Sequence, residues 1–172
     1  MCPSKLTEPD VDIVDAFTFL GLEITDSLDW HQNTNSIITK AQQRLFFLRR
    51  VRSFKVNKSV MLNFYRGIIE SILTKGIIVW YGNITAEDKA RLQRIVNTAS
   101  RIIGTELTSV ETLYQERLLK RAESIVSDVH HPGSSNFELL KSGRRYRSIA
   151  TRTNRFLNSF FPSVVRALNG NF

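Results

Sequence analysis

Cysteine, long apolar runs and secretory signals are all scarce or missing in this chain of 172 residues. Its one cysteine, Cys2, has no partner for an intramolecular disulfide and cannot build a thiolate zinc site alone. The most apolar window, residues 67–81, contains Glu70 and Lys75 and is too short to span a bilayer. The N-terminus lacks a basic-then-apolar signal sequence. We therefore expect a soluble, intracellular protein, nuclear or cytoplasmic, with no membrane partner.

Acidic residues are absent from the forty residues between Trp30 and Ile69, which carry eight Lys and Arg. By contrast, residues 1–29 hold seven of the 16 acids in the chain and only one of its 24 Lys and Arg. The formal net charge of +8 is therefore concentrated after residue 29. A basic body behind a short acidic segment is typical of proteins that bind a polyanion such as nucleic acid.

Motifs that carry catalytic chemistry are also missing. The sequence contains no glycine-rich phosphate loop, no Gly-x-Ser-x-Gly elbow, no His-Glu-x-x-His and no paired-aspartate metal motif. The His-x-Asp pair of iron-dependent oxygenases is absent, because Gln and Asn follow His31 and Pro and Gly follow His131. His130 and His131 have no third metal ligand within reach in the sequence. We predict no catalytic residue, no metal and no cofactor, and we expect that the chain is not an enzyme.

Hydrophobic periodicity predicts a mainly α-helical fold, a bundle of four to six helices with one short N-terminal β-strand or hairpin remnant. The alternation in residues 17–25 indicates a strand, for which the sequence shows no second strand. An unpaired edge strand of this kind tends to aggregate. Four helices are expected, over about residues 30–53, from Asn57 or Ser59 to near Gly82, from after Thr85 to Gly104, and from Ser109 to before Pro132.

The remaining residues are less regular. Residues 137–140 are predicted to form one helical turn, and residues 156–168 a helix that Pro162 either kinks or restarts. The predicted organisation is an acidic, extended or disordered lead (1–15), a strand (16–28), a four-helix bundle (29–131), and a basic loop with a C-terminal helix (132–172).

Two cationic segments are the candidate binding sites. The first lies around the end of the first predicted helix, where phosphates would be bound by cations and bases would stack on neighbouring aromatic rings. The alternative is that the aromatic residues are core and the cations form a solvated face. The candidates are Lys40, Arg44, Arg49, Arg50, Arg52, Lys55 and Lys58.

The second cationic segment is residues 142–148, in which Gly143 gives the loop conformational freedom. Arginines offer forked donors to phosphate, and a tyrosine can stack on a base. The alternative is a structural cluster in which the arginines pair with acids of the fourth helix, Glu111, Glu116 or Glu123. The candidate residues are Arg144, Arg145, Tyr146 and Arg147.

Six separated segments together resemble the C-terminal part of a LINE-type (non-LTR) retrotransposon reverse transcriptase, and the resemblance covers nearly the whole chain. The segments are FLGLEI (19–24), KAQQRLFFLRR (40–50), NFYR (63–66), IESILT (69–74), VWYGN (79–83) and SGRRYRS (142–148).

This resemblance implies that Phe19, Leu20 and Gly21 belong to a primer-grip-like element at the end of a palm domain. It implies that the helices resemble a thumb, which holds an RNA or RNA–DNA duplex. The metal-binding aspartates, fingers and endonuclease of that family lie upstream of any segment in this sequence, and the zinc knuckle of some relatives needs cysteines that it lacks. The chain is thus expected to be a non-catalytic fragment whose partners include the missing palm and fingers, or a nonfunctional helical remnant.

A second resemblance is narrower. Residues 40–74 are similar to a segment catalogued as the N-terminal region of AlkB-homologue-8-type proteins, which unite an RNA-binding module, an iron/2-oxoglutarate oxygenase and a tRNA methyltransferase. This resemblance implies an RNA-modification protein as the alternative function. The sequence shows neither an oxygenase ligand motif nor a glycine-rich methyl-donor loop.

Overall fold

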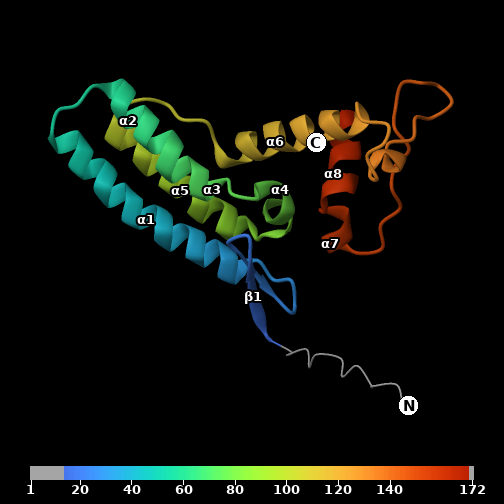
Figure 1. Ribbon diagram of the computed structural model, residues 1–172, viewed down its shortest axis with the longest axis horizontal. Coiled ribbons are helices and arrows are strands. Elements are labelled where there is room, and N and C mark those ends of the chain that lie inside the picture. Colours follow the sequence, from blue (N-terminus) through green and yellow to red (C-terminus); the bar gives the residue numbers. More distant parts are fainter. Residues whose placement is uncertain (1–13, 171–172) are drawn as a thin grey trace, which may run out of the picture.

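A computed structural model describes residues 14–170 and confirms the mainly α-helical fold with a short N-terminal hairpin (Figure 1). The predicted acidic lead, residues 1–15, lies almost entirely outside the described residues. In chain order the elements are β1 (Ala16–Phe19), β2 (Leu22–Thr25), α1 (His31–Ser53), α2 (Lys58–Phe64), η1 (Tyr65–Glu70), α3 (Ser71–Leu73), α4 (Ile77–Trp80), η2 (Tyr81–Asn83), α5 (Ala86–Ile103), α6 (Val110–Val126), η3 (Ser134–Asn136), α7 (Asn154–Leu157) and α8 (Phe160–Leu168).

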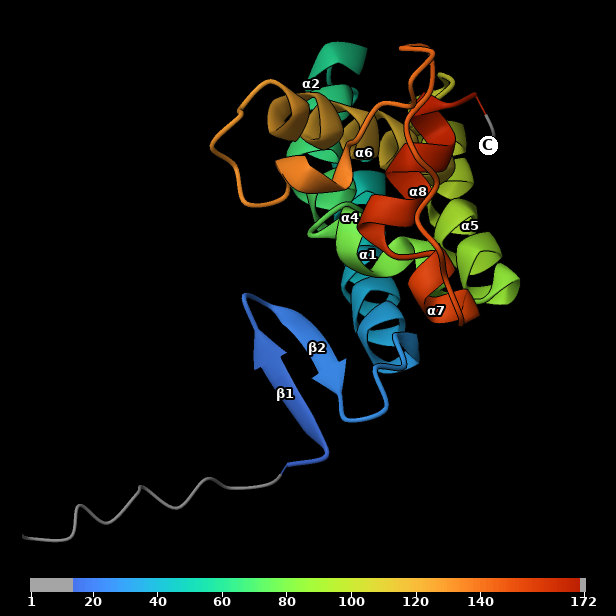
Figure 2. The ribbon, with the colours of Figure 1, turned by 90° about the vertical axis from the view of Figure 1, so that its right-hand side faces the viewer.

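The core forms where α1, the α2–α3 segment and α5 lie alongside one another, with α6 leading away to α7 and α8 at the far end (Figures 1 and 2). α1 buries one stripe spaced three or four residues apart, which includes Ala41, Leu45 and Leu48. Leu92 on α5 and Leu118 on α6 are fully buried in the same core. No helix in residues 14–170 is long and apolar enough to cross a membrane.

Capping residues explain where α5 begins and ends and where α6 begins, and these bounds agree with the predicted ones. α6 ends at Val126, earlier than the predicted end before Pro132. The Thr85 hydroxyl accepts from the N–H of Asp88 at 3.1 Å, and the Ser109 hydroxyl accepts from the N–H of Thr112 at 3.0 Å. Gly104 ends α5 with φ of +75°, a left-handed conformation that glycine adopts at little cost.

The predicted second helix does not run unbroken to Gly82, so that prediction is wrong. Gly76, at φ of +58°, interrupts it after α3. The interruption leaves backbone carbonyls without helical donors, and two side chains bind them. Arg117 of α6 donates to the Thr74 carbonyl at 2.7 Å, and the nearby Trp80 indole donates to the Lys75 carbonyl at 2.9 Å. Trp80 is fully buried.

The segment η1, between α2 and α3, is a π-helix, which contains an extra residue relative to α-helical spacing. Tyr65 at its start is fully buried, and its hydroxyl has no hydrogen-bond partner within the described part of the chain. Burial, with a smaller contribution from the charge of Glu70, raises the pKa of Tyr65.

The predicted strand is in fact two strands. β1 and β2 pair antiparallel, and Phe19 lies opposite Leu22 across a two-residue turn. Leu20 and Gly21 both have positive φ, +50° and +76°, as turns that match the strand twist require. The expectation of an orphan strand overlooked this Leu-Gly turn. β2 is held against α1 by the Glu23 N–H, which donates to the Asn33 side-chain oxygen at 3.2 Å.

The C-terminal region differs from prediction in one place. Residues 137–140 are not a helical turn; Leu139 instead forms a bridge with Tyr146. Residues 138–140 pair with residues 145–147 on either side of this bridge. The Arg147 N–H donates to the Glu138 carbonyl at 2.7 Å, and the Leu140 N–H donates to the Arg145 carbonyl at 2.8 Å. Further along, Pro162 lies in the first turn of α8, where a missing N–H is tolerated, so it marks the start of a second helix.

Candidate nucleic-acid interface

The structure divides the first predicted cationic segment between two flanks of α1. Because successive helical residues are about 100° apart, Arg49 lies on the flank that faces α5, whereas Arg44 and Arg50 lie on the flank that faces α2 and η1. Lys40 and Lys55 are exposed. Within residues 14–170 no Lys or Arg of α1 forms an ion pair with a carboxylate.

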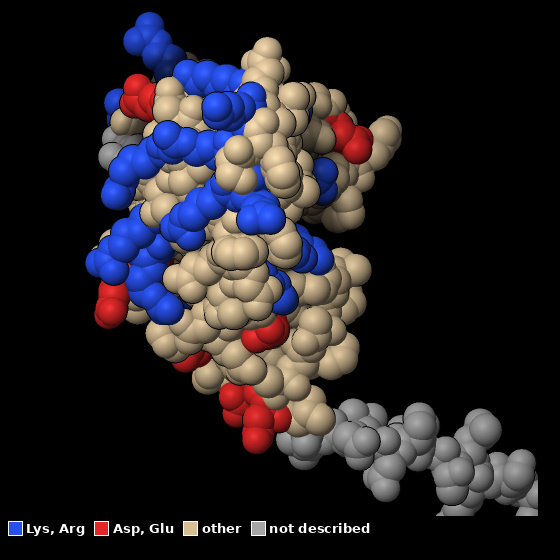
Figure 3. Space-filling model, turned by 90° about the vertical axis from the view of Figure 1, so that its left-hand side faces the viewer, with Lys and Arg blue, Asp and Glu red and all other residues tan. Residues whose placement is uncertain are grey.

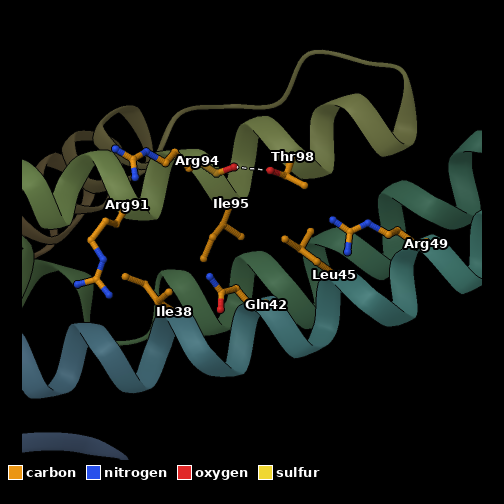
Figure 4. A pocket seen from close by; sticks show the side chains of 8 residues that line it. All are labelled: Ile38, Gln42, Leu45, Arg49, Arg91, Arg94, Ile95 and Thr98. Carbon is orange, nitrogen blue, oxygen red and sulfur yellow. Dashed lines mark hydrogen bonds between the residues drawn. The ribbon is translucent and has the colours of Figure 1, made fainter.

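A groove of about 440 Å³ lies between the packed helices α1 and α5, and we call it the cationic groove. Figure 4 shows Ile95 of α5 pointing toward Gln42 of α1, with Arg91 at one end and Arg49 at the other. Arg94 lies on the α5 side. The groove is lined by Ile38, Gln42, Leu45, Arg49, Arg91, Arg94, Ile95 and Thr98. Three guanidinium groups around one open groove can bind an extended anion.

Arg91 is held in place by a buried carboxylate. Asp88 is only 2% exposed, and its carboxylate lies 2.8 Å from Arg91 Nη1 and 3.1 Å from His31 Nδ1. Burial opposes ionisation of Asp88, but hydrogen bonds from His31, Arg91 and Thr85 outweigh it and hold its pKa below the ordinary value. These contacts join the first turn of α1 to that of α5 and fix one end of the cationic groove.

Two predicted binding residues instead bind the C-terminal end of α5. Arg52 donates to the Arg101 carbonyl at 3.3 Å, and Lys58 donates to the Gly104 carbonyl at 2.8 Å. The last carbonyls of a helix lack intrahelical donors and carry partial negative charge. Arg52 and Lys58 therefore have a structural role at this helix end, whatever else they bind.

A second groove, of about 450 Å³, lies on the other flank of α1, and we call it the aromatic groove. Its floor is apolar, and two arginines lie at its rim. The Arg44 guanidinium lies 5.8 Å from the ring centre of Phe47, and that of Arg50 lies 5.8 Å from the ring centre of Phe54. The groove is lined by Arg44, Phe47, Arg50, Val51, Phe54, Phe64 and Ile68.

Figure 3 views the end of the molecule at which α1 ends and α2 begins. Lys and Arg side chains cover much of its upper and middle part, whereas Asp and Glu are fewer and lie mainly near its margins, most of them in the lower half. The charge asymmetry of the sequence is thus a spatial asymmetry as well.

The second predicted segment lies at the opposite end of the long axis, in the loop that follows η3 (Figure 1). Tyr146 anchors this loop: its ring packs edge-on against Phe137 at 6.0 Å, and its N–H donates to the Asn169 side chain at 2.8 Å. Arg147 pairs with Glu138 at 3.3 Å rather than with an acid of α6. Arg144 and Arg145 are exposed.

The predicted primer-grip-like residues form the tip of the hairpin. Phe19 and Leu20 are more than half exposed, and Gly21 packs so closely against the Lys75 side chain that a larger residue would displace it. The hairpin tip therefore docks beside the interruption between α3 and α4.

Potential metal ligands remain apart. In the described residues, no group of three or more His, Cys, Asp or Glu side chains is placed to hold a metal ion. His131 accepts from the N–H of Gly133 at 3.0 Å and lies 3.4 Å from Arg121, so its ring orders the turn after α6.

Arg91 and Arg94 were missed by the reasoning from sequence. The available signal was a second acid-free segment, residues 89–105, which contains four cations between Asp88 and Glu106. On its own this segment is an ordinary polar helix face. Only its packing against α1 reveals that two acid-free segments meet at one groove.

Comparison with protein families gives a match over residues 30–71 to the family described as "Alkylated DNA repair protein alkB homolog 8, N-terminal". The matched part comprises α1, α2, η1 and the first residue of α3. No curated protein and no solved structure matches the chain significantly. The resemblance to a reverse transcriptase therefore rests on the sequence motifs alone, and the similarity to the AlkB-homologue N-terminal family covers this helical segment.

Proposed function

We propose that this chain binds nucleic acid without sequence specificity, with the phosphate backbone lying along the cationic groove. The observation that carries the proposal is that two acid-free cationic segments, residues 30–69 and 89–105, converge on this groove. A groove with guanidinium groups at both ends and no acid in its lining suits a polyanion better than a small neutral ligand.

The geometry of α1 supports a backbone-binding role. Its 23 residues extend about 35 Å, which is the length of about ten base pairs of duplex. Cations that project from helix sides can follow successive phosphates, and such contacts position a duplex without reading its bases. Arg49 and Arg94 are the exposed cations of the groove and are assigned the main phosphate contacts.

In keeping with the sequence motifs, we further propose that the chain is a thumb-like, non-catalytic part of a reverse transcriptase. In that arrangement the helical bundle grips an RNA or RNA–DNA duplex, and the palm and fingers that carry the chemistry are its partners. The exposed tip of the hairpin would lie toward the palm.

A salt titration tests the binding proposal. The affinity of the chain for a fluorescent RNA–DNA duplex is measured by anisotropy from about 50 to 200 mM salt, and we expect log affinity to fall linearly with log salt. Arg49→Ala with Arg94→Ala should lower both the affinity and the salt slope, the slope by about two. Lys120→Ala, at an exposed cation of α6, is the control and should change neither.

The result that defeats the proposal is the absence of measurable affinity at about 50 mM salt, where phosphate contacts are still strong. That result would favour the nonfunctional remnant.

A second candidate is RNA modification of the AlkB-homologue type, which the family match over residues 30–71 favours. The matched segment holds His31 and Glu70 as its only His, Cys, Asp or Glu residues, which does not provide a ligand set for iron. Binding of Fe²⁺ with 2-oxoglutarate, or of a methyl donor, measured by calorimetry on the purified chain, decides this candidate. No binding of either would remove it.

A further inference from the structure

The proposed function assigns no role to the aromatic groove. Two of its rings, Phe47 and Phe54, are 46% and 68% exposed, and Ile68 beside them is 37% exposed. An exposed apolar patch rimmed by charged residues commonly marks an interaction site. A ligand with flat apolar faces and negative charge would match the rings and arginines of this groove.

The two arginines at the rim of this groove indicate how such a ligand would be bound. The Arg44 and Arg50 guanidinium groups each lie 5.8 Å from a phenylalanine ring centre. Exposed rings and guanidinium planes are the surfaces on which single-stranded nucleic acids stack their bases. Both arginines lie in the acid-free residues 30–69, so no acid of that segment would repel the phosphates that accompany the bases.

We infer that the aromatic groove binds unpaired bases of a single strand, by stacking on Phe47 and Phe54. This inference rests on the proposed function and adds a substrate class to it: a single strand, or a duplex with an unpaired extension. Bases within a duplex already stack on one another and present only their edges, so a duplex alone would leave the groove empty.

The placement of the two grooves supports this inference. Both grooves use α1 as a wall, the cationic groove through Arg49 and the aromatic groove through Phe47, with Phe54 directly after the helix. A helix with its side chains is about 10–12 Å across, so one strand passing over α1 can reach both grooves. An acidic apolar peptide is the competing ligand, and the effect of the ring variants on single-strand binding distinguishes the two.

The test compares a single-stranded oligonucleotide with a blunt duplex of the same length, by anisotropy at fixed low salt. Phe47→Leu and Phe54→Leu retain apolar bulk and remove the ring. We expect each to weaken binding of the single strand about 5-fold or more and to leave duplex binding unchanged. Phe156→Leu is the matched control, because Phe156 is also 46% exposed but lies on α7. Phe47→Tyr, which keeps a ring, should bind as the unmodified chain does.

Each other outcome has a definite meaning. If the ring variants bind the single strand normally, the inference is overturned and the groove is left to a peptide ligand. If they lose single-strand and duplex binding equally, it is also overturned, because the rings then support the whole surface. If the unmodified chain binds neither nucleic acid, the proposed function itself fails. Thermal unfolding of every variant by circular dichroism identifies any general loss of folding.

Discussion

The two flanks of α1 present grooves of nearly equal volume and opposite character. Toward α5 the groove is bordered by three arginines, and between them Gln42 and Thr98 alternate with aliphatic side chains. Toward α2 and η1 the floor is apolar, and two arginines lie over phenylalanine rings. One acid-free helix thus supplies both grooves, and the neighbouring helix decides which chemistry each one has.

This difference shows that a cationic sequence is not a single binding surface. On α1 and at the start of α2 the cations have different environments: Arg49 borders the cationic groove, and Arg44 and Arg50 border the aromatic groove. Arg52 and Lys58 bind the end of α5. The next variants separate these environments, from the largest expected effect to the smallest.

Charge reversal in the cationic groove is expected to have the largest effect. Arg49→Glu with Arg94→Glu removes two phosphate contacts and adds repulsion, so affinity for single strand and duplex alike should fall about 100-fold or more at low salt. Anisotropy titrations measure this change. Lys120→Glu with Arg152→Glu changes the net charge equally at exposed residues outside both grooves. An equal loss in that control would mean that net charge alone governs binding.

Removal of the Asp88 carboxylate should loosen one end of the cationic groove. Asp88→Ala leaves His31 and Arg91 without their acceptor, and we expect the free energy of unfolding to fall by about 1–3 kcal/mol in urea titrations. The conservative control Asp88→Glu keeps the charge. An unfolding free energy unchanged in Asp88→Ala would show that this contact does not join α1 to α5.

The same carboxylate predicts a pH dependence. Because the folded-state pKa of Asp88 is lowered, its contribution to stability is present above its unfolded pKa of about 4 and is lost as pH falls through the folded value. Urea titrations from pH 7 to pH 2 should therefore show a steeper acid loss of stability in the unmodified chain than in Asp88→Ala. Parallel pH profiles for the two proteins would contradict this assignment.

The cations at the end of α5 should affect stability more than binding. Arg52→Ala and Lys58→Ala each remove a donor from terminal carbonyls of α5, so each should lower stability by about 0.3–1 kcal/mol in thermal or urea unfolding. Duplex affinity should change less than about twofold, a small effect beside the loss expected of a phosphate contact. An affinity loss as large as that of Arg49→Ala would instead show that Arg52 and Lys58 contact phosphate.

The distant loop should have the smallest effect. On a duplex of about ten base pairs, roughly the length of α1, we expect Arg144→Ala with Arg145→Ala to leave affinity unchanged, because the loop lies at the other end of the molecule. On a duplex of about thirty base pairs the same variant should weaken binding by up to about threefold. A loss already present on the short duplex would show that both regions contact one short stretch.

Much of the helical framework was predictable because its signals are local. Thr85, Ser109 and Gly104 mark helix ends through bonds and backbone angles within a few residues, and the sequence places these ends correctly. The interruption at Gly76 was not predictable in this way. It depends on Arg117, which lies 43 residues beyond the carbonyl that it binds.

The candidate site was only partly predictable, for the same reason. The absence of acids on α1 correctly marked a cationic region, but the assignment of each cation depends on which helix lies beside it. Arg91 and Arg94 become part of the groove only because α5 packs against α1. Residue spacing cannot distinguish Arg49, which borders a groove, from Arg52, which binds a carbonyl of another helix.

The π-helical segment Tyr65–Glu70 lies between α2 and α3 and determines in which directions the side chains before and after it point. Phe64 and Ile68 face the aromatic groove, while Leu73 after the π-helix is buried in the core. Because the π-helix accommodates one extra residue, deleting one residue within it, such as Gly67, would restore α-helical spacing and leave the downstream residues close to their present orientation. Leu73 would then stay in the core, whereas the same deletion inside the regular helix α5 would turn all later residues of that helix by about 100°. The α2–α3 segment should therefore tolerate the loss of one residue that α5 would not.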